Sequence, residues 1–310
     1  MVFRYSGFIL ICIILLSGCF HDNIDNDPVY FIDAHSQVDD ELGNLDTILT
    51  RMNANNVKKT ILATRGNLSK GELLDFAASH TDSIIPSIRT KGNQYETDSQ
   101  SYYDDIEEDS LNTNYGAIAE LLSYHAAKEE KGAPEVAVLP GDARIQTALT
   151  IAQSKNWPLV IHIEFASLSA TDKDIYWTEL KTLLDDNPNT AIVLIHMAQL
   201  DSSEVKQLID AHANVYFITS HTDPITIANS VEPWTALFSN GVLASDWKTL
   251  MTDNPSRFIF AMDNVWSNHW GNRYDKVMRY WKEAMADLPQ NVAEQIAHGN
   301  AERLWNIRAP

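Results

Sequence analysis

The amino-acid sequence predicts an α/β fold, a closed (β/α)8 (TIM) barrel built as a single domain. Apolar runs rich in β-forming residues alternate with amphipathic segments in about eight units along the 310 residues. Nearly every run is apolar throughout, which is typical of parallel strands that are buried on both faces of a sheet. At this chain length, such an alternation favours a closed barrel over an open doubly wound sheet.

The expected elements follow this alternation in order. Strands are expected at residues 29–35, 57–64, 83–89, 116–122, 158–164, 190–197, 214–220 and 257–263. Helices are expected near residues 44–55, 69–79, 99–112, 142–155, 173–186, 202–211, 233–251 and 271–286. The fourth strand is the weakest, because residues 116–122 also suit the start of a helix and residues 135–139 form a competing short strand. No glycine-rich phosphate loop follows any strand, which disfavours a nucleotide-binding fold.

The start of the chain is not expected to belong to the barrel. Arg4 supplies a positive charge ahead of residues 8–16, an apolar stretch too short to span a bilayer as a mature helix. The sequence Leu16-Ser17-Gly18-Cys19 resembles the lipobox of bacterial lipoproteins, which implies cleavage before Cys19 and its acylation. An ordinary signal peptide or an uncleaved anchor are the alternatives. The expected organisation is a signal peptide at residues 1–18, a polar tether at 19–28 and the barrel at 29–310.

The resemblance to a lipobox implies a protein of the bacterial cell envelope, held on a lipid bilayer by acylated Cys19. Phe20, and not an aspartate, follows the cysteine. By resemblance to enterobacterial sorting rules, this implies the outer membrane in a host that has one. The variant Cys19→Ser should therefore remain unprocessed or become soluble, because it has no thiol to acylate. Palmitate labelling tests this, and label that persists in Cys19→Ser would refute the lipoprotein assignment.

Amino-acid composition excludes some classes of partner and some kinds of catalytic residue. The formal net charge is −19, and so acidic a surface repels phosphate backbones, which argues against nucleic acid as a partner. The only two cysteines are Cys12 and Cys19, both ahead of the barrel. The folded domain therefore has neither a thiolate metal ligand nor a cysteine nucleophile. Any metal must be held by histidines and carboxylates.

Polar residues stand at the ends of four expected strands. Residues 29–38 (VYFIDAHSQV) turn polar toward their end, and His35 and Gln37 point to the same side of an extended backbone. His162, His196 and Asp263 end three later strands, with Glu164 two residues beyond His162. Any one of them alone would be better explained as a hydrogen-bonded core or rim residue. Together, on the face where the carboxyl ends of barrel strands meet, they suit a catalytic divalent metal, Zn2+ first, that activates water.

The segments FIDAHSQ, LVIHIE, VLIHMA, RFIFAMDN and HGNAERLWNI resemble, in this order, the amidohydrolase-related branch of the metal-dependent hydrolase superfamily. The resemblance runs from about residue 29 to the C-terminus and implies a (β/α)8 barrel with its metal at the carboxyl ends of the strands. It implies that His35 and His162 are ligands and that Asp263 is both ligand and proton acceptor. His196 is implied to be a ligand or the residue that polarises the substrate.

Gln37 departs from the family pattern, which usually has a second histidine there. A neutral amide oxygen holds Zn2+ less well than imidazole, so Mn2+ or Mg2+ are alternatives, as is the loss of the metal. Glu120 matches a bridging acid on the fourth strand of some relatives, and a helix-surface glutamate is the alternative. Arg89, His125 and His269 are candidate substrate contacts.

The function predicted from these residues is metal-dependent hydrolysis of a small amide, lactone or ester. A non-oxidative decarboxylase or other lyase of the same family would use the same ligands. A degenerate barrel that serves as a surface-anchored binding protein is the alternative from a different class, and Gln37 is its motivation. The expected partner is a small-molecule substrate, and the sequence leaves the oligomeric state open.

Overall fold

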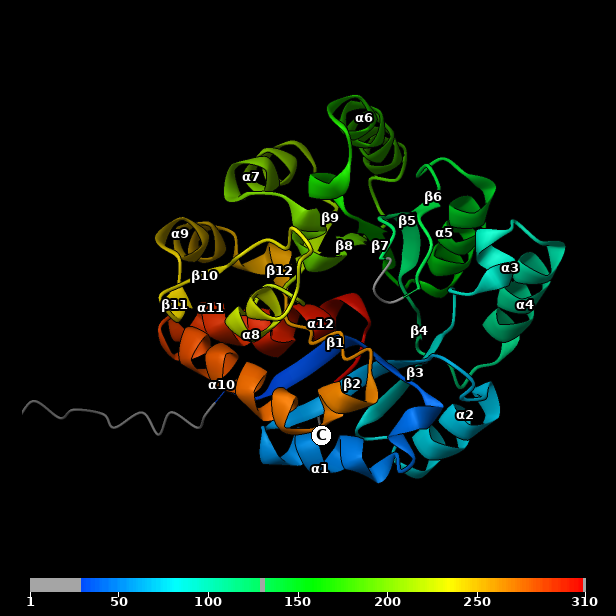
Figure 1. Cartoon of the computed structure of the whole chain (residues 1–310), viewed down its shortest axis with the longest axis horizontal. Coiled ribbons are helices and arrows are strands. Elements are labelled where there is room, and N and C mark those ends of the chain that lie inside the picture. The colour runs from blue at the N-terminus through cyan, green and yellow to red at the C-terminus, as the bar shows by residue number, and fades with distance from the viewer. Residues whose placement is uncertain (1–28, 129–131, 309–310) are drawn as a thin grey trace, which may run out of the picture.

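The computed structural model describes residues 29–128 and 132–308, and within them a ring of parallel strands is surrounded by helices (Figure 1). This confirms the predicted α/β barrel fold. The expected signal peptide, Cys19 and the tether lie outside the described residues. Among the described residues, no helix has the length and apolar character that a bilayer span requires.

Eight strand positions make up the barrel, each hydrogen-bonded in parallel to the next. The strands are β1 (Phe31–Val38), β2 (Val57–Thr64), β3 (Ile84–Ile88), β4 (Ala117–Ile118) with β5 (Leu121–His125), β7 (Leu159–Ile163), β8 (Ile192–Leu194), β9 (Val215–Ile218) and β12 (Phe258–Ile259). Backbone hydrogen bonds close the ring, from Ala34 N–H to the Phe260 oxygen (3.1 Å) and from Asp263 N–H to the His35 oxygen (2.8 Å). The closure brings the first and last strands of the chain side by side.

The fourth position is a strand in two pieces. β4 pairs with β3, β5 pairs with β7, and Ala119 and Glu120 separate the two pieces. The expected short strand at residues 135–139 also exists, as β6 (Val136–Ala137), but it adds antiparallel to β5 outside the ring. The helical alternative for residues 116–122 is therefore wrong, and the interruption leaves Glu120 between two neighbouring barrel strands.

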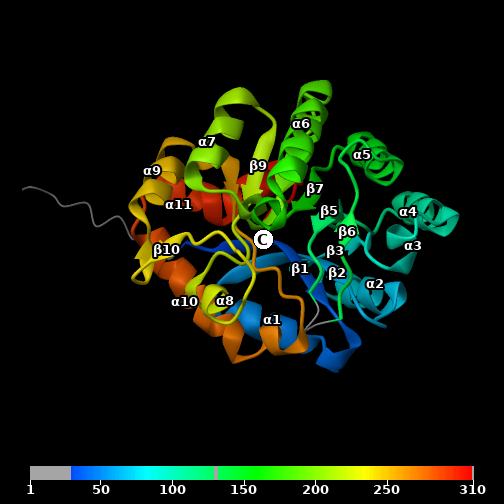
Figure 2. The ribbon, with the colours of Figure 1, turned by 45° about the horizontal axis from the view of Figure 1, so that its top comes forward.

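Helices follow the strands and lie around the outside of the ring (Figures 1 and 2). The helices at expected positions are α1 (Asp46–Ala54), α2 (Lys70–Ser79), α4 (Gln100–Leu111), α5 (Ala143–Lys155), α6 (Ala170–Asp186), α7 (Ser202–Ala211), α9 (Ser245–Asp253) and α10 (Asn272–Ala286). Short helices that the sequence did not predict are α3 (Asn93–Glu96), α8 (Pro224–Ala228), α11 (Gln290–Glu294) and α12 (Asn300–Leu304).

One predicted helix, at residues 233–251, is wrong over its first half. A hairpin of β10 (Phe238–Ser239) and β11 (Val242–Leu243) stands there, and the helix α9 begins only at Ser245. Asn240 and Gly241 join the two strands with positive φ values of 52° and 84°. An Asn-Gly pair is the preferred connection of a two-residue hairpin, because both residues tolerate the left-handed conformation.

Successive residues of each strand point to opposite faces of the sheet, so the strands contribute to two separate apolar layers. Phe31 and Leu159 belong to the layer between the strands and the helices, whereas their neighbours Ile32 and Val160 point into the barrel. Trp305, which follows α12, packs with this inner layer. The inner layer is apolar, and the buried polar side chains gather beyond it, toward the carboxyl ends of the strands.

Asp33 ties β1 to its neighbours from inside this core. Its fully buried carboxylate accepts hydrogen bonds from the Ser36 hydroxyl (2.6 Å), the Thr60 hydroxyl (3.1 Å) and the Met262 N–H (2.8 Å). Burial raises the pKa of Asp33 to about 6, an effect that these hydrogen bonds oppose. The group therefore links the strand that carries His35 to the segment that carries Asp263.

Asp33→Ala should lower the free energy of unfolding by about 3 kcal/mol or more, because each of three buried donors left without a partner costs about 1–3 kcal/mol. Urea denaturation followed by circular dichroism measures this. Asp46→Ala, an exposed change in the first turn of α1, is the matched control and should stay within about 0.5 kcal/mol of the parent. A loss below 1 kcal/mol for Asp33→Ala would mean that its donors find other partners.

Candidate metal centre

The carboxyl ends of the strands bring the predicted ligands into one buried cluster. His35 and Gln37 lie on β1, Glu120 between β4 and β5, His162 on β7, His196 directly after β8 and Asp263 after β12. All six side chains are buried. Burial of this many ionisable groups is costly unless they pair with one another or with a ligand.

The β1 side of the cluster is centred on two carboxylates. His35 Nε2 lies 3.4 Å from Glu120 Oε1 and 3.5 Å from Asp263 Oδ1, and it is buried without a hydrogen-bond partner. Gln37 Nε2 lies 3.2 Å and 3.0 Å from the same two oxygens. The structure thus turns the amide nitrogen of Gln37, a donor, toward the acids, whereas the sequence predicted its oxygen as a metal ligand.

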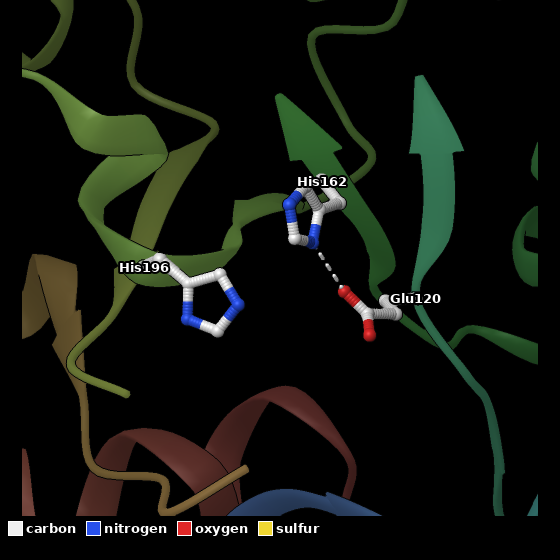
Figure 3. A group of neighbouring side chains, drawn as sticks. All are labelled: Glu120, His162 and His196. Carbon is white, nitrogen blue, oxygen red and sulfur yellow. Dashed lines mark hydrogen bonds and ion pairs between the residues drawn. The ribbon is translucent and has the colours of Figure 1, made fainter. Parts of the chain in front are cut away.

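Glu120 connects this side to β7. Its Oε2 lies 2.9 Å from His162 Nδ1 (Figure 3). On the other side of the ring, His162 Nε2 lies 3.1 Å from Glu164 Oε1. Burial alone would lower the pKa of His162, but the hydrogen bonds and charges of Glu120 and Glu164 raise it to about 9. Glu120 is only 1% exposed, so the alternative of a helix-surface glutamate is wrong.

His196 approaches the same cluster from the β8 side (Figure 3). Its Nδ1 lies 3.2 Å from the Ser220 carbonyl oxygen, which can only accept, and 2.9 Å from the Ser220 hydroxyl, which can donate or accept. Its Nε2 lies 3.4 Å from Asp263 Oδ2. Burial and the nearby His221 hold the pKa of His196 well below its usual value. A neutral ring with its proton on Nδ1 leaves the Nε2 lone pair for the cluster, as in metal-ligating histidines.

Strained backbone positions two of these side chains and that of His221, whose ring stacks on His196. His196, His221 and Asp263 have φ values of 55°, 57° and 45°. Non-glycine residues rarely adopt this left-handed conformation, which costs on the order of 1–3 kcal/mol each and concentrates at functional sites. The strain turns the chain sharply at the ends of the strands and directs the side chains to the cluster.

The sequence analysis missed three charged or basic residues of this site. His221 stacks on His196 with ring centroids 4.4 Å apart, and its Nε2 lies 3.5 Å from Asp263 Oδ2. Lys91 forms an ion pair with Glu120, and Lys128 forms one with Glu164 at 2.7 Å. His221 comes one residue after an expected strand, so reading just past that strand end would have found it. Lys91 comes two residues after its expected strand, where a lone lysine gives no such signal.

A cavity of about 470 Å³ opens above the cluster, with Gln37, Glu120, His162, His196 and Asp263 among its lining residues. This volume suits a small organic molecule.

Of the candidate substrate contacts, Arg89 and His125 line the cavity, and burial lowers the pKa of His125 to about 3. The structure places His269 outside the lining, where its Nδ1 accepts a hydrogen bond from Val265 N–H at 3.1 Å.

The donors fit a divalent cation. Three overlapping groups each offer three ligand atoms within 4.8 Å of one another: Glu120 with His162 and His196, His196 with His221 and Asp263, and His35 with Glu120 and Asp263. The unpaired Nε2 of His35 faces two carboxylates, a position in which a cation would satisfy all three atoms. Imidazole and carboxylate ligands suit Zn2+ first and Mn2+ second.

Solved structures with the same fold include three enzymes of low sequence identity. A 4-oxalomesaconate hydratase from Rhodopseudomonas palustris is 15% identical, with 89% of this chain and 95% of that chain covered and a TM-score of 0.58. A dihydroorotase from Campylobacter jejuni is 11% identical, with 90% of this chain and 84% of that chain covered and a TM-score of 0.55. An amidohydrolase from Burkholderia multivorans with bound zinc is 14% identical, with 90% of this chain and 100% of that chain covered and a TM-score of 0.53. At these identities the similarity concerns the fold.

A search of curated proteins gives no match. A family model described as amidohydrolase matches residues 130–307, more than half of the chain. The chain belongs to the amidohydrolase family.

Proposed function

We propose that this protein is a metal-dependent hydrolase that uses water to cleave a carbon–nitrogen or carbon–oxygen bond in a small amide, lactone or ester. One observation carries the proposal: histidines and carboxylates from six strand positions converge beside a small-molecule cavity, and all of them but His35 line it. Family membership supports hydrolytic chemistry of this general type.

We propose His35, Glu120 and Asp263 as the core of the metal site, with His162 and His196 on its far side. The first three offer mutually close donor atoms, and His35 Nε2 has no other partner. A divalent cation bound there would lower the pKa of a water molecule toward neutrality. Zn2+ is the first candidate, and Mn2+ or Mg2+ are alternatives because Gln37 replaces an imidazole ligand.

Asp263 is the proposed general base. Its carboxylate stands at the centre of the site, close to His35, His196 and His221, at the edge of the cavity. A carboxylate there accepts the proton that water loses as it attacks.

His196 was predicted either to ligate the metal or to polarise the substrate. Its Nδ1 contact with the Ser220 carbonyl favours an unprotonated Nε2, and therefore the ligand role.

The proposal is tested by turnover of a panel of small amides, lactones, esters and carboxylic acids in water enriched in ¹⁸O, with Zn2+ or Mn2+ present. A hydrolase places one labelled oxygen in the product acid. A decarboxylase would instead release CO2 and leave the organic product unlabelled. Absence of turnover with every substrate and metal would favour the binding protein over both enzymes.

We further propose that the enzyme acts in the bacterial cell envelope, anchored through Cys19. The proposal rests on the lipobox-like residues 16–19, which precede the described part of the chain. The palmitate labelling of Cys19→Ser tests it.

A further inference from the structure

Two arginines stand together at the mouth of the cavity. Arg65 follows β2 and Arg89 follows β3, so neighbouring strands of the barrel carry them to the same end. Both are half-buried and both line the cavity that holds His162 and Asp263. Each arginine is therefore in reach of a molecule bound over the cluster.

Backbone carbonyls hold the two guanidinium groups in place. Arg65 donates to the Val265 oxygen (3.3 Å), and its guanidinium carbon lies 3.6 Å above the ring of Trp266. Arg89 donates to the Lys91 oxygen (3.1 Å) and to the oxygen of Gly66 (3.0 Å), the residue next to Arg65. These contacts use only part of each group's five N–H donors, and Arg89 is near enough to act electrostatically on Arg65.

The two arginines differ from the other cations of the cavity. Lys91 and Lys128 are each paired with a buried glutamate. In the ranges 29–128 and 132–308, no carboxylate lies within ion-pair distance of Arg65 or Arg89, although Asp39, Asp263 and Glu41 are near enough to favour the charged form of Arg65. Burial lowers the pKa of both arginines, and Arg89 also disfavours the charge of Arg65. Two adjacent, partly desolvated like charges are unfavourable without an anion between them.

We propose that Arg65 and Arg89 bind a carboxylate of the substrate, so that the enzyme acts on small molecules that carry a free carboxylate beside the bond to be cleaved. The inference rests on the proposed hydrolase function, because it concerns the same cavity. Guanidinium groups bind carboxylates through paired N–H···O bonds. The mouth is also lined by Asp39, Asp40, Glu41 and Glu96, which oppose the two charges concentrated on one phosphate group more strongly than the single charge of a carboxylate group.

The test is calorimetric titration of the metal-loaded enzyme with glutarate, with its uncharged diamide as the matched neutral probe. Glutarate should bind saturably and the diamide should not. Arg65→Gln and Arg89→Gln should each weaken glutarate binding about 10- to 100-fold, since a hydrogen bond to a charged group contributes about 1.5–3 kcal/mol. Arg279→Gln, an exposed change on α10, removes the same charge away from the cavity and should leave binding unchanged.

Other outcomes overturn the proposal. Glutarate that binds equally to both arginine variants would be held elsewhere, for example on the metal. Absence of binding to the parent protein also refutes it, as does tighter binding of inorganic phosphate that both variants lose. Metal-dependent hydrolysis of neutral esters with no effect of the arginine variants would refute the carboxylate site and leave the hydrolase intact. Arginine-dependent glutarate binding without metal-dependent hydrolysis would refute the hydrolase alone.

Discussion

Asp263→Asn should fold normally and lose nearly all turnover, with kcat falling by about 10² to 10⁴, the usual contribution of a positioned general base. The Asp263 carboxylate lies 3.0 Å from Gln37 Nε2, 3.4 Å from His196 Nε2 and 3.5 Å from His35 Nε2. Asparagine keeps the shape and one oxygen acceptor but removes the charge and the basicity. Folding should suffer little, because carboxylates crowded into one buried cluster oppose stability.

The measurement pairs steady-state kinetics with thermal melting of the metal-free protein. Glu96→Gln is the control, because it removes one negative charge from the lining of the same cavity at an exposed position away from the cluster. It should keep its turnover. If Asp263→Asn unfolds while activity per folded molecule is unchanged, Asp263 is a structural acid and the proposed mechanism is wrong.

The barrel could be predicted because its strands carry a local signal. A parallel strand buried on both faces is mostly apolar, and even residues 57–64, with Lys58 and Lys59 near the start, form a strand with the predicted bounds. The run at 190–197 is only a strand at Ile192–Leu194, because His196 and the three residues after it adopt positive φ. Ordinary side chains do not encode that conformation, and the surrounding structure imposes it.

The site was predictable to the extent that its residues interrupt apolar runs. His35, His162, His196 and Asp263 do so, and the structure brings all four together. Lys91 could not be found in this way, because an isolated lysine after a strand resembles any solvated loop residue. Its role depends on Glu120, whose burial follows from a break in a strand that the sequence did not reveal.

Chelation should abolish turnover, and one equivalent of divalent metal per chain should restore it. The cluster and its immediate partners contain three carboxylates, Glu120, Glu164 and Asp263, and two ammonium groups, Lys91 and Lys128. Ligation requires neutral imidazoles, so His162, whose pKa is raised to about 9 without a metal, must lose its proton when an ion binds. In that ligating state, one negative charge remains uncompensated before the ion is counted. A single dication reverses this to one positive charge, whereas a second dication would leave three positive charges in a buried site, at a large electrostatic cost. The ammonium group of Lys91 already pairs with Glu120, the carboxylate that a second ion would have to neutralise.

Elemental analysis of the dialysed protein and competition with a chromophoric chelator measure the stoichiometry and the affinity. Gln37→His replaces an amide that donates to both Glu120 and Asp263 with an imidazole that can ligate, so the metal affinity should rise by about tenfold or more. Gln37→Ala is the matched control, because it removes the same hydrogen bonds without adding a ligand, and its affinity should rise less. Two ions in the parent protein, or turnover that survives complete chelation, would contradict the single-metal site. Equal affinities for Gln37→His and Gln37→Ala would show instead that position 37 does not reach the ion.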